Sequence, residues 1–113
     1  MKSITQFRLN ILIHQQVLKM PAPTSELSVP NYCVDIKEAM AVLKACHARA
    51  ADMNDGDNSE YLVRINLDTS GDSSIYLLER RLMESTRVWM FNGVDELPDA
   101  ICEFACLLFR VKK

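Results

Sequence analysis

The segment from residue 97 to residue 111 is apolar on almost every side of a helix. Its polar residues are Asp99, Glu103 and Arg110, which at about 100° per residue fall within roughly 40° of each other. A helix that lies on a small domain needs an apolar stripe of only ~100° or somewhat more. The apolar surface of this helix is therefore wider than one sheet can cover. We expect a second surface to cover the rest.

Composition points to one small globular domain. The chain has 113 residues, is 49% apolar and 25% charged, and carries a net charge of −2. Acidic and basic residues are mixed, so the clustered basic face typical of nucleic-acid binding is missing, and an anionic membrane surface is disfavoured for the same reason. No apolar run suits a secretory signal or the ~18 residues of a membrane span. We expect a cytoplasmic protein that binds neither nucleic acid nor membrane.

The four cysteines, Cys33, Cys46, Cys102 and Cys106, are expected to be free thiols, because no export signal precedes them. Free cysteine usually behaves as a small buried hydrophobe. With His47, these residues are also potential zinc ligands. However, no CxxC or HxxxH spacing occurs, and Cys46 and His47 diverge by about 100° around a helix. We expect no metal and no cofactor, and we interpret His47 as a core or interface histidine.

A helix is predicted from near Asp35, where Asp35 and Glu38 form a capping pattern, to just before Asn54. Alanine-rich composition supports it. The residues predicted to share its buried face are Ile36, Ala39, Met40, Leu43, Cys46, His47 and Ala50.

Three strands are predicted after this helix. Residues 61–67 alternate, with Tyr61, Val63, Ile65 and Leu67 directed inward. Residues 74–83 fit either a helix or a strand, and the hairpin context favours a strand. A third strand covers residues 88–91.

The start of the chain is less regular. Residues 4–13 alternate like a strand, although a helix is the alternative. Residues 21–33 hold three of the four prolines and are predicted to be a linker. We expect residues 1–20 to be a strand or an appendage and residues 34–113 to form one domain. The predicted fold class is α+β: a two-layer sandwich in the order β-α-β-β-β-α, with two helices on one face of a three- or four-stranded antiparallel sheet.

Two patterns fail as nucleic-acid or metal motifs. With Gly56 at the required glycine of a calcium loop, Ala51 and Met53 occupy ligand positions and Leu62 stands where a bidentate acid is needed. The order helix, three strands, helix also occurs in double-stranded-RNA-binding domains, whose last helix begins with basic residues. Here residues 95–99 are acidic and would repel phosphate.

One dense charge cluster consists of Glu79, Arg80, Arg81, Glu84 and Arg87. Such a cluster is usually a solvated face with weak ion pairs. The alternative is the polar rim of a protein interface, where arginine is enriched.

The leading functional hypothesis is a non-enzymatic protein-interaction module that docks through the helix at 97–111. It would be a homodimer or an accessory or inhibitory subunit of a bacterium or phage. The physical basis is the excess apolar arc, since large exposed apolar patches are rare on monomers. The predicted interface residues are Trp89, Ala100, Cys102, Leu107 and Phe109.

Two alternatives stay open. A small-ligand-binding domain would hold its ligand in an apolar pocket between sheet and helices. The residues predicted to line that pocket are Met40, His47, Tyr61, Tyr76 and Phe104. An enzyme that uses His47 or a cysteine is the third hypothesis, but spacing identifies no partner group, so we expect no catalytic residue.

Overall fold

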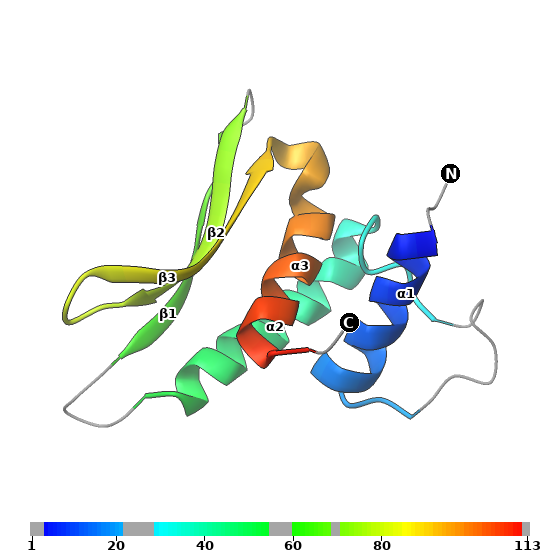
Figure 1. The fold of residues 1–113 in the computed structure, drawn as a ribbon, viewed down its shortest axis with the longest axis horizontal. Helices are drawn as coiled ribbons and strands as arrows, with labels where there is room; N and C mark the ends of the chain where they lie inside the picture. Colours follow the sequence, from blue (N-terminus) through cyan, green and yellow to red (C-terminus); the bar gives the residue numbers. More distant parts are fainter. Residues whose placement is uncertain (1–3, 22–28, 55–59, 69–70, 112–113) are drawn as a thin grey trace.

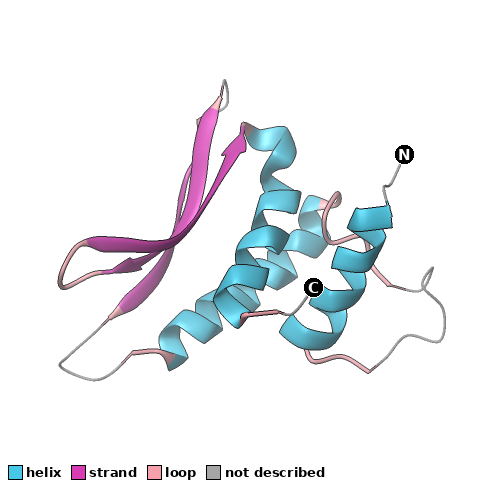
Figure 2. Ribbon diagram, viewed as in Figure 1, coloured by secondary structure: helices cyan, strands magenta, loops and turns pink. Residues whose placement is uncertain are grey.

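The computed structural model describes residues 4–21, 29–54, 60–68 and 71–111. In this part of the chain an antiparallel sheet lies on one side of a helix pair, and a further helix lies on the other side of that pair (Figure 1). Figure 2 shows the strands gathered at one side of the molecule and the helices at the other. The predicted α+β class is confirmed, and a third layer is added to the predicted two.

Helix α2 (Ile36–Asp52) begins and ends as predicted. The Asp35 carboxylate accepts a hydrogen bond of 2.9 Å from the backbone N–H of Lys37, which caps the helix. The buried residues are Ala39, Val42, Leu43, Cys46 and Ala50.

The predicted buried face of α2 was wrong at one edge. Ile36, Met40 and His47 are exposed. Helix α2 packs chiefly along helix α3 (Leu97–Phe109) and less on the sheet. This contact and the contact with β1 bury the face of α2 that carries Val42, Leu43 and Cys46, and the edge with Ile36, Met40 and His47 turns to solvent.

The sheet consists of β1 (Tyr61–Asn66), β2 (Asp72–Glu79) and β3 (Glu84–Asn92), in the order β1-β2-β3. The strand prediction for the ambiguous residues 74–83 is confirmed for 74–79, whereas residues 80–83 form a turn, and β3 begins at Glu84 rather than at residue 88. Val63, Ile75, Leu77 and Phe91 are buried in the core shared with the helices. Ile65 and the following Leu67 were predicted to face the core but are exposed, because β1 is an edge strand, while Ile75, which pairs with Ile65 on the central strand, is buried.

The pairing of β2 with β3 contains one irregularity. Ile75 pairs with Trp89, whereas Leu77 pairs with Thr86, so β3 contains one extra residue between these pairs. Arg87 lies at this place with a φ of 53°, in the left-handed region that non-glycine residues seldom adopt. This arrangement is a β-bulge, which bends its strand and increases the local twist.

The predicted first strand was wrong: the segment is helix α1 (Ile4–Leu12), which continues into the π-helical turn η1 (Ile13–Val17). Leu9, Ile13 and Val17 are buried. Together with the buried Asn10 they lie within about 100° of one another on a helix, whereas a strand would place Asn10 on the face opposite to the other three. The segment therefore follows the helical pattern of these buried residues and not the strand-like alternation at residues 4–13.

The second surface over α3 is therefore this N-terminal segment of the same chain. Helix α3 contacts β2 and β3 on one side and η1 on another, while α2 lies alongside it. The buried residues of α3 are Pro98, Ala100, Ile101, Cys102, Phe104, Ala105, Cys106 and Leu108. The wide apolar arc read from the sequence is thus enclosed within one chain.

Polar contacts fix α1 to residues that were predicted to lie in the linker. The buried Asn10 accepts a hydrogen bond of 3.1 Å from the backbone N–H of Cys33 and donates one of 3.2 Å to the Oδ1 of Asn31. His14 Nδ1 lies 2.8 Å from the Tyr32 hydroxyl. The rest of the predicted linker, residues 22–28, lies outside the described residues. None of the helices in the described ranges has the length and apolar character needed to cross a membrane.

Candidate interaction surface

The five predicted interface residues do not form one exposed surface. Ala100 and Cys102 are 1% and 0% exposed, because the chain itself covers them. Trp89 and Phe109 are half-buried, and the Arg49 guanidinium lies 5.6 Å from the centre of the Phe109 ring. Of the group, Leu107 alone is classed as exposed.

The five predicted pocket residues are likewise dispersed. Phe104 is fully buried, whereas Met40 and His47 lie on the exposed edge of α2. Tyr61 and Tyr76 are half-buried. Tyr76 lies between the buried Ile75 and Leu77 on β2, so its side chain is on the sheet face away from the helices. These residues do not converge on one cavity.

The most exposed apolar side chains lie in the turn between β2 and β3. Leu82 is 69% exposed and Met83 is 71% exposed, more than any other large hydrophobic side chain of the described residues. The turn lies at the edge of the molecule, on the side away from α1 (Figure 1). We call residues 80–83 the hairpin tip. Turns are usually built from Gly, Pro, Asn, Asp or Ser, so an apolar pair at this place is unusual.

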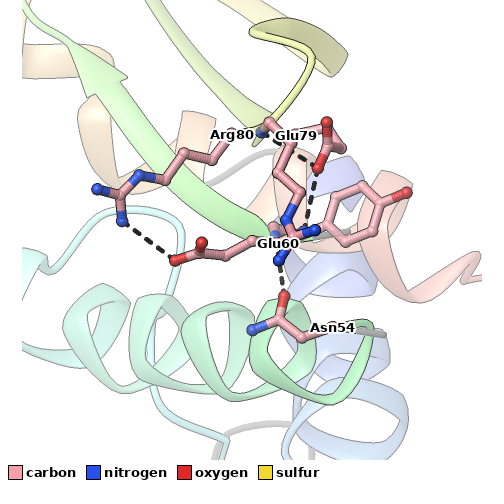
Figure 3. Close-up of polar contacts among 6 residues, drawn as sticks. Asn54, Glu60, Glu79 and Arg80 are labelled. Carbon is pink, nitrogen blue, oxygen red and sulfur yellow. Dashed lines mark hydrogen bonds and ion pairs between the residues drawn. The ribbon is translucent and has the colours of Figure 1, made fainter. Parts of the chain in front are cut away.

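The Glu79 carboxylate holds the hairpin tip in place (Figure 3). Its Oε2 accepts a hydrogen bond of 2.7 Å from the backbone N–H of Leu82. Its Oε1 accepts from the backbone N–H groups of Glu60 at 3.0 Å and Arg81 at 3.3 Å. These hydrogen bonds lower the pKa of Glu79, because they favour the ionised carboxylate. The tip is thus a fixed turn with two apolar side chains directed to solvent.

Contacts with residues 54, 60 and 61 of the same chain also stabilise the hairpin tip. The Arg80 guanidinium forms an exposed ion pair of 3.1 Å with Glu60, and the Arg80 backbone N–H donates to the Glu60 carbonyl at 2.8 Å. Asn54, just after α2, accepts a hydrogen bond of 2.6 Å from the Tyr61 backbone N–H (Figure 3). The charge cluster read from the sequence therefore has a structural member, Glu79, and a half-buried one, Arg87, besides the exposed Arg80 and Arg81.

A hollow of about 370 Å³ lies at the opposite end of β3, where the chain enters α3. Three residues of β3, Trp89, Met90 and Phe91, line it together with residues 33 and 34. Three carboxylates, Asp95, Glu96 and Asp99, complete its wall. The Glu96 carboxylate also accepts a hydrogen bond of 2.8 Å from the Asn92 backbone N–H. We call this site the acidic hollow; it combines aromatic surface with negative charge.

The cysteines are free and buried, as predicted. Burial raises the pKa of Cys46 to about 12. A hydrogen bond with Cys33, followed by burial, raises the pKa of Cys102. Both thiols are protonated near neutral pH and are weak nucleophiles, since the thiolate is the reactive form. The described residues contain no group of three or more His, Cys, Asp or Glu side chains placed to hold a metal ion.

Comparisons with protein-family models, with curated proteins and with solved structures found no match to this chain. Its function is therefore inferred from its own surface. Two features stand out there: the hairpin tip before β3 and the acidic hollow at the end of β3.

Proposed function

We propose that this chain is a non-enzymatic protein-interaction module that docks on a partner protein through the hairpin tip. The observation that carries the proposal is the pair Leu82 and Met83, both more than two-thirds exposed on a turn fixed by Glu79. Fully burying one such side chain is worth about 1.5–3 kcal/mol. Because the turn is already ordered, little conformational entropy would be lost when it binds.

The charges around the tip indicate what the partner site looks like. Arg80 and Arg81 directly precede the apolar pair, and arginine is enriched at protein interfaces. A matching site has an apolar pocket for Leu82 and Met83 and carboxylates at its rim. The chain would act as a homodimer or as an accessory or inhibitory subunit. We retain the cytoplasm as the expected compartment, because four free cysteines are typical of a reducing environment.

The helix at 97–111 is not the docking surface in this proposal. Its apolar arc is covered by α2, η1 and the sheet, so little of it is available to another molecule. The interaction hypothesis is retained, and the surface that carries it moves to the hairpin tip.

The proposal is tested by comparing three immobilised proteins in an extract of the native host. These are the wild type, a tip variant with Leu82→Glu and Met83→Glu, and a control with Ile36→Glu. Ile36 is also an exposed apolar residue, at 44%, but it lies on α2. We expect a partner that is retained by the wild type and the control and lost by the tip variant. The same set of retained proteins on all three would contradict the proposal.

A further inference from the structure

The acidic hollow and the hairpin tip have complementary chemistry. The tip offers two apolar side chains, Leu82 and Met83, next to Arg81 and to Arg80, which also forms an ion pair with Glu60. The hollow offers aromatic and thioether surface from residues 89–91 and three carboxylates. Arginine binds both to carboxylates and to aromatic faces, so each part of the tip has a counterpart in the hollow. Its volume of about 370 Å³ lies within the range of sites that bind side chains or small ligands.

The positions of the two features favour a second copy of the chain as the partner. The tip precedes the first residue of β3, and the hollow surrounds its last residues. The nine residues of β3 span roughly 30 Å at about 3.3 Å per residue. Strand β3 is also an edge of the sheet, and none of the described strands pairs with its outer side. Two copies laid antiparallel along β3 therefore bring each tip to the other copy's hollow.

We propose that this protein forms a two-fold dimer in which the hairpin tip of each copy enters the acidic hollow of the other. This inference rests on the proposed function and names its partner. A two-fold arrangement forms the same contact twice, as an isologous interface requires. It also covers one further exposed apolar side chain of β3, Val88 at 46%, and Met90 of the hollow is itself 63% exposed. Charge complementarity fixes the antiparallel orientation, since a parallel arrangement would place tip against tip and hollow against hollow.

The test uses charge reversal at the two ends, with Arg81→Glu in the tip and Asp95→Lys in the hollow. Asp95 is exposed and lines the hollow, and the Arg81 substitution keeps the backbone N–H that Glu79 accepts. Sedimentation equilibrium of the full chain should show a dimer for the wild type. Each single variant should dimerise at least tenfold more weakly, because both of its contacts then oppose like charges.

Mixing the two variants gives the decisive measurement. In the mixed pair, the reversed tip meets the reversed hollow and the unchanged tip meets the unchanged hollow, so both contacts are attractive. We expect heterodimers to form where each variant alone is a monomer. The double variant in one chain should dimerise again for the same reason.

Each other outcome has a definite meaning. A wild type that stays monomeric up to several hundred micromolar overturns the dimer, as does a dimer that neither reversal weakens. If the dimer fails but the tip variant still loses a partner from the extract, the docking proposal stands and the partner is a different protein. If the dimer fails and the tip variant loses nothing, both proposals fail.

Discussion

The helical body and the β2–β3 hairpin differ in where they place their apolar side chains. In the body, α3 is apolar on nearly all sides, and the chain encloses it with the sheet, α2 and the α1–η1 segment. In the hairpin, Leu82 and Met83 are directed to solvent from a turn that Glu79 holds in shape. The segment with the most apolar residues, α3, is therefore covered by the rest of the chain, whereas the two apolar residues of the turn are exposed to solvent. The exposure of the side chains, and not the number of apolar residues in a segment, therefore distinguishes the hairpin tip from α3.

The same contrast appears in the use of polar groups. Inside the body, the buried Asn10 joins α1 to residues 31 and 33 and so completes the cover over α3. In the hairpin, Glu79 joins the tip to the start of β1. One network closes the core, and the other fixes the shape of a projecting turn.

The largest effect is expected from Phe104→Ala in α3. Phe104 is fully buried, so its truncation leaves a cavity and should lower the free energy of unfolding by about 3–5 kcal/mol. Urea denaturation measures the change. Leu107→Ala on the same helix is the control, because Leu107 is 39% exposed and should cost far less. Equal losses for the two variants would mean that α3 is not enclosed as described.

A smaller loss is expected from Asn10→Ala. This substitution leaves the buried backbone N–H of Cys33 without its acceptor, which costs about 1–3 kcal/mol. Arg8→Ala, at an exposed position on the same helix, serves as the control. If Asn10→Ala does not shift the urea midpoint, α1 is an appendage after all, and the cover over α3 must come from elsewhere.

At the hairpin, acid should release the tip without unfolding the body. The pKa of Glu79 is lowered in the folded chain, so its stabilising effect is complete above the ordinary carboxyl pKa and is lost as the pH falls through the lowered value. The protection factors of the Arg81 and Leu82 amides should fall in that acidic range. In Glu79→Gln these amides should exchange rapidly already at neutral pH. Protection that persists in Glu79→Gln would show that other contacts hold the turn.

The smallest expected change in stability comes from Met83→Gly, and it is a gain. Met83 has a φ of 55°, a conformation that costs a non-glycine residue about 1–2 kcal/mol. Glycine removes this cost but has its own entropic cost, so thermal unfolding should show a gain of about 1 kcal/mol at most. The substitution also removes half of the apolar pair, so dimerisation and partner binding should weaken. A variant that binds as well as the wild type would exclude Met83 from the interface.

Much of the fold could be predicted from local patterns. The start of α2 at Asp35, the hairpin strands and the closing helix followed from capping, alternation and periodicity. The predicted buried face of α2 was wrong at Ile36 and His47. The apolar residues of α2 cover a wide arc, so the sequence pattern alone does not determine which part of that arc contacts the neighbouring elements. The N-terminal helix was missed because two periodicities overlap in the same residues.

The candidate site was less predictable because tertiary contacts create it. Glu79 reaches the backbone of Glu60 only through the pairing of Tyr61 with Glu79, which no local pattern reveals. The acidic hollow is lined by residues 33 and 34 together with residues between 89 and 99, which are distant in the sequence. One signal was present in the sequence: a turn that contains Leu82 and Met83 in place of Gly, Asn or Asp.

The extra residue at Arg87 gives this hairpin an adjustable direction. On both sides of it the strand keeps its alternation, with Trp89 and Thr86 each opposite a buried residue of β2. A chain shortened by this one residue would keep every side chain on its present face and would lose only the bend. Strand length at this point therefore sets the direction in which the turn projects, while the core sequence stays the same.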